Sequence, residues 1–483
     1  GGGVDGQGGH SNRSVGNYPV GVITRNHNTC MATSRRSRLD LLRKGPMKVL
    51  RTIPITTVWS GHPVHFDLLS NKERQFIAFY DAERKMTVGQ RPLGEVEFDL
   101  HRLAGKWLEA RGRLSTDIAW DSHNSVTMAI DRDDQIHLCG NMHVDPLIYF
   151  RTTTPLDVSS FERVDYMVGE HEDRCTYPAF MRGPNGELVF RFRDGASGNG
   201  VDYYNQYDEA SAAWRRLVDA PILDGMDEMN AYARMPELGR DGRYHMIWMW
   251  RDTPDCATNH DISYARSRDL VTWEAGDGST LPLPITVRAT PSIVDPVPAG
   301  GGLINMCQSL GFDAANRPIV SYHKHDDNGN TQAYAARLEE DRWAIYKLSD
   351  WDYRWNFGGN GSITAEIRLG GAKISEDGFL SMNWWHIEKG AGIWKLDETS
   401  LKVVGTYPES HPELPPELSQ VELNYSGMRV RTTSERSTAD AAAEPGVDRY
   451  LLRWETLDTN RDQPRDEIPP PSMLHLYALS CGD

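Results

Sequence analysis

The chain has 483 residues, 39% of them hydrophobic, and a formal net charge of −16 at pH 7. This negative balance argues against a protein that coats nucleic acids, because such proteins usually present a basic surface. No apolar run approaches the roughly 18 residues of a membrane span. The six cysteines lie far apart in the sequence, which excludes a disulfide-dense scaffold and a zinc ribbon.

The first 46 residues are predicted to be a disordered tail or a leader. Their opening stretch is rich in Gly and Asn and lacks the basic-then-apolar order of a signal peptide. A denser pattern begins at Met47, and we predict that residues 47–483 form a single catalytic domain.

From residue 51 onwards the chain alternates short apolar runs with turns rich in Gly, Asp and Asn, as in "RQFIAFYDAERKMTVGQR" and "DGRYHMIWMWRD". About seven such units, each of roughly 50 to 70 residues, predict an all-β, seven-bladed β-propeller. The strand 51–59 is expected to pair with C-terminal strands and close the ring, which would remove two sheet edges.

Polar residues at predicted strand ends mark the mouth of such a ring, where loops from several blades meet. His123, His143, Tyr177 and Arg193 fit this position and are the candidate catalytic residues. Side chains from the same loops and the following blades are predicted to bind substrate: Asn124, Asn230, Tyr232 and Arg251. His137 and Cys139 share one strand face and are expected to point into the core.

Two histidines, a tyrosine and an arginine suit β-elimination from a uronic acid. The C5 proton becomes acidic only when the carboxylate charge is neutralised, which a forked arginine can do. A histidine has the basicity to take that proton near neutral pH, and a tyrosine or histidine can protonate the leaving oxygen. The residue types leave open which group is the base and which the acid.

The segments "WDSHN", "GNMHVDPLIYFR", "TYPAF" and "FRFRDGASGNG" resemble the seven-bladed propeller polysaccharide lyases, the ulvan lyases and the rhamnose–glucuronate lyases of gum arabic. "SRDLVTWE" (267–274) also resembles a bacterial-neuraminidase repeat. The resemblance implies a secreted or periplasmic monomer that cleaves the rhamnose-α-1,4-uronate bond of ulvan or of arabinogalactan. Its partner would be an anionic polysaccharide or oligosaccharide, not nucleic acid or a membrane, and its product a 4,5-unsaturated uronate.

The same resemblance implies a structural ion, zinc rather than calcium, with no metal needed for catalysis. One thiolate and three imidazoles suit tetrahedral zinc. The predicted ligands are drawn from Cys307, His260, His323, His325 and His386. Because His323 and His325 alternate onto the same strand face, either could be the ligand.

Two other classes of function fit the same ring. A glycoside hydrolase would need either paired carboxylates at the mouth, or an arginine triad with a tyrosine and glutamate as nucleophile. For the first of these, Asp121, Asp145, Glu172 and Asp202 are available. A non-catalytic carbohydrate-binding propeller would use stacking aromatic residues, which the 14 tryptophans supply.

Overall fold

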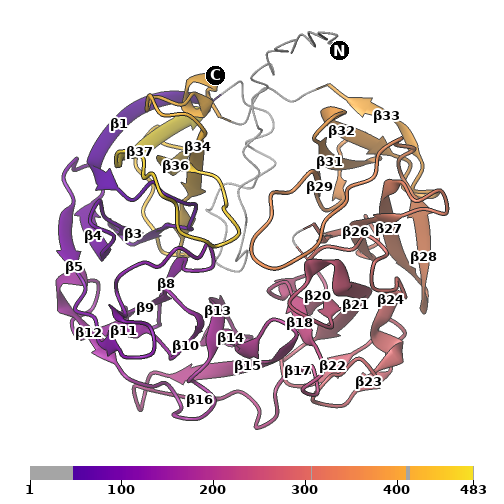
Figure 1. The fold of residues 1–483 in the computed structure, drawn as a ribbon, viewed down its shortest axis with the longest axis horizontal. Helices are drawn as coiled ribbons and strands as arrows, with labels where there is room; N and C mark the ends of the chain where they lie inside the picture. Colours follow the sequence, from indigo (N-terminus) through magenta and orange to yellow (C-terminus); the bar gives the residue numbers. More distant parts are fainter. Residues whose placement is uncertain (1–46, 306, 409–413, 482–483) are drawn as a thin grey trace, which may run out of the picture.

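The computed structural model describes residues 47–305, 307–408 and 414–481, and its regular structure is almost entirely β. Figure 1 shows sheets that follow one another around a ring, as in a propeller. The all-β propeller arrangement predicted from the alternating apolar runs is therefore confirmed. The tail predicted for residues 1–46 lies outside the described residues.

In the described residues, six blades are built from strands that lie near one another in the sequence, where the repeat count predicted about seven units. The third blade includes a short strand, His143–Asp145, that lies within the sequence of the second. The first blade holds β2 (Asp67–Asn71), β3 (Arg74–Tyr80), β4 (Met86–Pro92) and β5 (Asp99–Arg102). The second holds β8 (Val126–Ile130), β9 (Ile136–Gly140), β11 (Tyr149–Thr152) and β12 (Phe161–Val164). The third holds β10 (His143–Asp145), β13 (Cys175–Arg182), β14 (Leu188–Ala196), β15 (Asn199–Asp208), β16 (Ala213–Arg216) and β17 (Leu223–Asp224).

The other three blades complete this series. The fourth blade holds β18 (Asn230–Ala233), β19 (Glu237–Leu238), β20 (Tyr244–Arg251), β21 (Asn259–Ser267), β22 (Trp273–Glu274), β23 (Thr280–Leu281) and β24 (Ile293–Asp295). The fifth holds β25 (Ser309–Phe312), β26 (Pro318–His325), β27 (Thr331–Glu339) and β28 (Arg342–Lys347). The sixth holds β29 (Ile367–Leu369), β30 (Lys373–Ile374), β31 (Leu380–His386), β32 (Gly390–Leu396) and β33 (Val403–Tyr407).

A further sheet, here called the end sheet, joins the two ends of the described chain. Its order is β1 (Met47–Val58), β37 (Ser472–Cys481), β36 (Arg449–Leu457) and β34 (Met428–Ser434). β1 runs antiparallel to β37 from the pair Met47–Cys481 to the pair Val58–Ser472. The pairing expected for the strand 51–59 is therefore present.

The remaining elements are short. β6 (Trp107–Leu108) and β7 (Arg113–Leu114) form a two-stranded ribbon, and β35 (Arg436–Ser437) pairs with β2. Four 3-10 turns complete the set: η1 (Val158–Ser160), η2 (Cys256–Thr258), η3 (Thr290–Ser292) and η4 (Pro416–Ser419). In the described part of the chain these turns are the helical elements, and none has the length or apolarity to cross a bilayer.

The alternating pattern buries one large cluster under the first three blades and the end sheet. Phe66 stacks on Trp454 of β36 with ring centroids 4.4 Å apart, which packs the end sheet against the first blade. His137 and Cys139 lie fully buried in β9, as predicted. His137 is bonded by Asp131 (3.1 Å) and by the Tyr149 hydroxyl (2.8 Å), so its polar atoms are satisfied inside the core.

The repeat-like segment 267–274 forms a compact turn between β21 and β22. The Asp269 carboxylate accepts the backbone N–H groups of Val271 (2.9 Å) and Thr272 (2.7 Å). The buried Trp273 donates its indole N–H to the Leu270 carbonyl at 3.1 Å. The aspartate thus closes the turn and the tryptophan anchors it, which explains why these two residue types recur at such turns.

Candidate functional site

The four candidate catalytic side chains come together where neighbouring blades end. His143 begins β10, Tyr177 lies in β13 and Arg193 in β14, and these strands are adjacent in one sheet. His123 lies in the loop before β8. Its ring stacks on that of His143 at 4.2 Å and meets the Tyr177 ring edge-on at 5.4 Å. The Arg193 guanidinium carbon lies 5.0 Å from the centre of the Tyr177 ring.

Asp121 joins the two histidines. Its carboxylate accepts the Nδ1 proton of His123 at 2.5 Å and that of His143 through its other oxygen. Burial alone would raise the pKa of Asp121, but these two hydrogen bonds outweigh it and hold the pKa below its ordinary value. Sequence reasoning did not select Asp121 for this role, although its spacing two residues before His123 was a usable signal.

The strand that carries His143 is held under backbone strain. Val144 has a φ of 60°, which is unfavourable for a β-branched residue. The buried Asp145 carboxylate accepts the His143 N–H at 3.0 Å and is itself paired with Arg111 at 2.6 Å. Arg111 lies in the turn between β6 and β7, so this ribbon fixes the direction of the His143 side chain from outside the sheet.

A β-bulge aims Tyr177 at the site. The register between β13 and β14 shifts between Thr176 and Ala179, and Tyr177 has a φ of 57°. The Thr176 hydroxyl oxygen accepts the Val144 N–H at 2.8 Å and an Arg193 guanidinium N–H at 3.2 Å. This one hydroxyl therefore ties the His143 strand to Arg193.

Arg193 is fully buried, yet two of its nitrogens, Nε and Nη1, have no hydrogen-bond partner. Asp202 lies opposite Arg193 in β15 but is bonded by Arg191 instead. Donors on a buried cation are rarely left unpaired in a folded protein. Their state indicates a place for an anionic acceptor such as a carboxylate.

The residues predicted to bind substrate lie beside this cluster. The Tyr232 ring is 6.1 Å from that of Tyr177, and Arg251 donates to the Tyr232 hydroxyl at 3.1 Å. Arg251 also donates to Asn305 (2.6 Å) and Ser197 (3.3 Å), two residues that the sequence did not single out. The side chains of the other two predicted residues, Asn124 and Asn230, are buried and keep amide atoms without partners. Unsatisfied amides of this kind suit the hydroxyl groups of a sugar.

Proton affinities divide the cluster into an acceptor and a donor. Burial, followed by the neighbouring His123, lowers the pKa of His143, which favours a neutral imidazole. Burial raises the pKa of Tyr177 despite the opposing effect of Arg193 and Arg251, so this phenol keeps its proton at neutral pH. A neutral imidazole can take a proton and a protonated phenol can give one.

The four carboxylates considered for a glycoside hydrolase all have hydrogen-bond or ion-pair partners. Asp121 holds the two histidines, Asp145 pairs with Arg111 and Asp202 with Arg191. Glu172 accepts the backbone N–H groups of Met167, Val168 and Gly169. None of these four carboxylates is therefore free to act in a carboxylate pair as hydrolysis requires.

The five predicted zinc ligands do not form one cluster. In the described ranges, one group of three His, Cys, Asp or Glu side chains has its possible ligand atoms within 4.8 Å of one another, and it consists of Asp121, His123 and His143. The hydrogen bonds from the two histidines to Asp121 explain why these atoms lie so close. His260 is held by Asp252 and Asp261, both at 2.9 Å, and His325 by Thr331 at 3.2 Å. Carboxylate and hydroxyl partners occupy two of the imidazoles from which the four zinc ligands were to be drawn, and the zinc site stays a prediction.

Three of those five residues keep features of ligands. Both ring nitrogens of the buried His323 and Nε2 of His386 have no hydrogen-bond partner. Burial lowers the pKa of His323 to about 3 and that of His386 to about 4, so both imidazoles are neutral, as a metal requires. The Cys307 thiol donates to the Ile367 carbonyl at 3.1 Å, and Ile367 pairs with His386 across β29 and β31.

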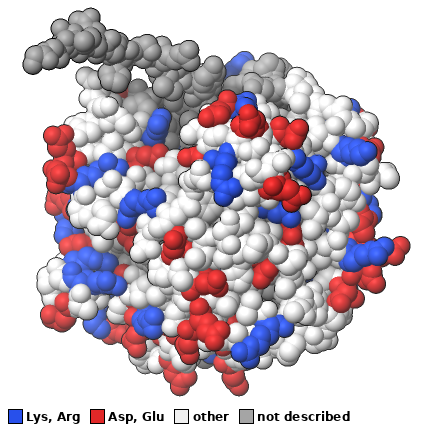
Figure 2. Space-filling view, turned by 45° about the vertical axis from the view of Figure 1, so that its right-hand side comes forward, with Lys and Arg blue, Asp and Glu red and all other residues white. Residues whose placement is uncertain are grey.

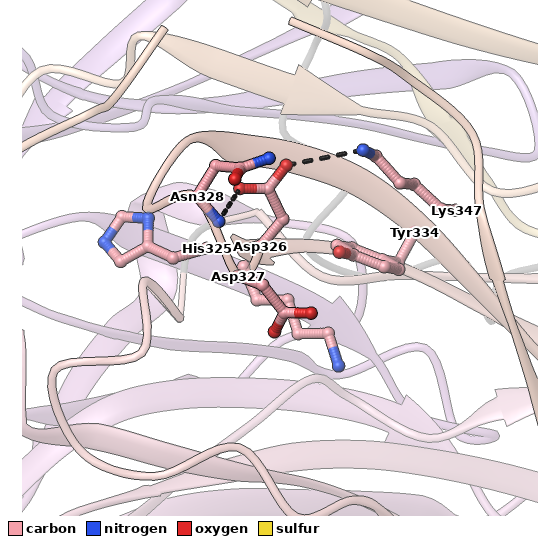
Figure 3. Close-up of a pocket in the computed structure, with 7 residues that line it drawn as sticks. His325, Asp326, Asp327, Asn328, Tyr334 and Lys347 are labelled. Carbon is pink, nitrogen blue, oxygen red and sulfur yellow. Dashed lines mark hydrogen bonds and ion pairs between the residues drawn. The ribbon is translucent and has the colours of Figure 1, made fainter. Parts of the chain in front are cut away.

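On the face seen in Figure 2, acidic and basic side chains are interspersed. A separate hollow between β26 and β27, drawn in Figure 3, is lined by Lys324, His325, Asp326, Asp327, Asn328, Tyr334 and Lys347. Its lysines are already paired, Lys324 with Asp295 at 2.6 Å and Lys347 with Asp326 at 3.3 Å. The hollow therefore offers no unpaired lysine to an anionic ligand.

The model of a family of BNR repeat-containing proteins matches residues 74–351, more than half of the chain. No curated protein matches it by sequence.

Solved structures share the fold at low identity. The polysaccharide lyase Uly1 is 13% identical with a TM-score of 0.56, over 90% of this chain and 100% of that one. A PL25 ulvan lyase is 14% identical with a TM-score of 0.54, over 89% of this chain and 96% of that one. A further structure of a PL25 ulvan lyase, 13% identical with a TM-score of 0.53 and the same coverage, contains bound -[GlcA(1-4)Rha3S]-.

Proposed function

The chain belongs to the family of BNR repeat-containing proteins, and from this premise we propose that it is a polysaccharide lyase. It cleaves the rhamnose-α-1,4-uronate bond of ulvan or of rhamnosyl-glucuronate in arabinogalactan and leaves a 4,5-unsaturated uronate. The observation that carries the proposal is the buried, incompletely bonded guanidinium of Arg193 beside two histidines and a tyrosine. The fold shared with polysaccharide lyases supports it.

The reaction follows from the position of each group. Arg193 binds the uronate carboxylate and withdraws its charge, which acidifies the C5 proton. A histidine Nε2 takes this proton, because the Nδ1 atoms of both rings donate to Asp121. The C5–H electrons form the C4–C5 double bond, the C4–O4 bond breaks, and O4 receives the proton of Tyr177.

Ulvan and gum arabic incubated with the protein test this proposal. Elimination creates a conjugated double bond, so ultraviolet absorbance is expected to rise with time. Mass spectrometry should find fragments lighter by one water than hydrolysis products. New reducing ends without absorbance would establish a hydrolase instead, and binding without new ends would establish a non-catalytic propeller.

A structural zinc stays part of the proposal, held by Cys307, His323 and His386. Their neutral imidazoles and thiol suit zinc, but their ligand atoms do not form a complete site, and no step of the reaction uses the metal. Protein purified without chelators is expected to contain about one zinc per chain. Elemental analysis measures this, and a metal-free preparation of full activity and unchanged melting temperature would remove zinc from the proposal.

The seventh blade and the closure of the ring also belong to the proposal: the end sheet is the seventh blade, and β1 locks it. The loop between β36 and β37 of this sheet contacts the loop before β29. There the Asp462 carboxylate accepts the backbone N–H of Ser362 at 2.8 Å and its hydroxyl at 3.1 Å. Removing residues 1–58 would expose an edge of β37 along its whole length. We expect the melting temperature to fall by about 5 °C or more, with removal of residues 1–46 as the control that leaves β1 intact.

We propose that the protein acts outside the cytoplasm, secreted or periplasmic, because its proposed substrates are extracellular polysaccharides too large to enter a cell. We also propose that it acts as a monomer.

A further inference from the structure

One carboxylate serves two imidazoles at the centre of the site. Asp121 Oδ1 accepts from His123 and Oδ2 from His143, in each case from the Nδ1 atom. An ionised carboxylate only accepts hydrogen bonds, so both imidazoles must carry their proton on Nδ1. Both Nε2 atoms are therefore lone-pair acceptors while the rings are neutral.

The backbone fixes Asp121 in this position. Its Oδ1 also accepts the His123 backbone N–H at 2.8 Å, and its carbonyl accepts the Asn124 N–H at 3.1 Å. No arginine or lysine of the described ranges forms an ion pair with it. Its negative charge is thus directed at the two imidazoles.

The stacking of the rings limits how many protons the pair can hold. With ring centroids 4.2 Å apart, two imidazolium cations would repel each other strongly in this partly buried place. One added proton, by contrast, brings the group of two histidines and Asp121 from a charge of −1 to zero. The pair is built to take up one proton and to refuse a second.

We propose that Asp121 is the positioning residue that makes His123 and His143 a single acceptor for one proton. This inference rests on the proposed function. In each turnover a neutral Nε2 takes the C5 proton, and the Asp121 charge balances the imidazolium. After Tyr177 has given its proton to O4, the pair returns the stored proton to the Tyr177 phenolate, whose ring lies 5.4 Å from His123. The enzyme regains its initial state, and no co-reactant is needed.

Other titratable and charged groups face the pair from the surrounding elements. They are Tyr177 of β13, Arg193 of β14, Tyr232 of β18, Arg251 of β20, His62 before β2, Arg84 between β3 and β4, Arg111 between β6 and β7, Asp145 at the end of β10, and Asp462 before β37. Arg193 repels an added proton on the pair, because its charge lowers the pKa of His143. Asp121 is the carboxylate among them that touches both rings.

The variant Asp121→Asn tests the inference. An asparagine can accept from one Nδ1–H but offers an N–H to the other ring, which then moves its own proton to Nε2 and stops accepting there. We expect kcat for elimination to fall about 100-fold or more, and KM to change little. The acid limb of the kcat profile should move to lower pH, because the remaining imidazole loses the charge that favoured its protonation.

Two matched variants separate this role from a structural one. Asp121→Glu keeps the carboxylate and is expected to restore the acid limb to its original pH with part of kcat. Asp241→Asn removes a similarly exposed carboxylate that bonds His245 at 3.1 Å, at the end of β20 remote from Arg251. This control should leave kcat and the pH profile unchanged. An Asp121→Asn enzyme with kcat within a few-fold of wild type and an unmoved acid limb would overturn the inference.

The wild-type protein provides a measurement that does not depend on a variant folding. Nδ1 protons bonded to a carboxylate resonate far downfield in proton NMR spectra. Two such resonances are expected from His123 and His143, and each should disappear in the corresponding His→Ala variant. Their absence in the wild-type protein would overturn the inference. If neither ulvan nor gum arabic is cleaved but both resonances are present, the proposed function fails while the proton pair stands.

Discussion

Replacement of Arg193 by alanine is expected to lower kcat/KM for elimination by about 100- to 1,000-fold or more. The buried guanidinium is the group that can bind the uronate carboxylate, since its Nε and Nη1 N–H groups have no partner. Without it the C5 proton stays next to a full negative charge and is not acidic enough for an imidazole. The rise of ultraviolet absorbance on ulvan and gum arabic measures the loss.

Two further variants define what Arg193 supplies. Arg193→Lys keeps the positive charge but loses the planar set of N–H donors. We therefore expect an activity between those of the wild-type enzyme and Arg193→Ala. Arg215→Ala removes an exposed arginine of β16 in the same sheet and should leave activity unchanged. Wild-type turnover by a folded Arg193→Ala enzyme would show that the carboxylate is bound elsewhere.

Replacement of Tyr177 by phenylalanine is expected to lower kcat about 100-fold or more, with little change in KM or melting temperature. The ring contacts with His123 and Tyr232 survive this change, and only the proton for O4 is lost. The matched control is Tyr346→Phe in the remote strand β28. It removes a hydroxyl that donates to the Glu339 carboxylate, and the variant should keep full activity.

A substrate that needs no acid sharpens this second prediction. A synthetic uronate with an acidic phenol at C4 releases a phenolate that is stable without protonation. We expect Tyr177→Phe to cleave it at nearly the wild-type rate, while Arg193→Ala stays inactive. If the phenyl substrate does not rescue Tyr177→Phe, the tyrosine acts in another way, for example as the base.

Much of the candidate site could be predicted because it is nearly contiguous in sequence. His123, His143, Tyr177 and Arg193 come from two adjacent blades, and each lies at or near the end of a strand whose alternation is visible in the sequence. Strand ends of neighbouring blades meet at one rim of a propeller, so local patterns were enough to select them. The same local reasoning placed His137 and Cys139 in the core.

Contacts between residues far apart in the sequence could not be predicted from local patterns. Nothing near residue 251 indicates that Asn305 will bond Arg251, and nothing near residue 307 shows that the predicted zinc ligands would stay apart. The second hydrogen bond of Asp121 joins it to His143, which lies 22 residues further along the chain at the start of β10.

The sequence by itself therefore determined the class of the fold and the residue types at its rim, because strand alternation and turn chemistry act over a few residues. Only the tertiary structure decided that β10 joins the third blade and not the second, that β1 joins β37 across the described chain, and that Asp121 binds both histidines. These three contacts depend on how twisted sheets pack around an axis. A small change in that packing moves atoms on opposite loops by more than the length of a hydrogen bond.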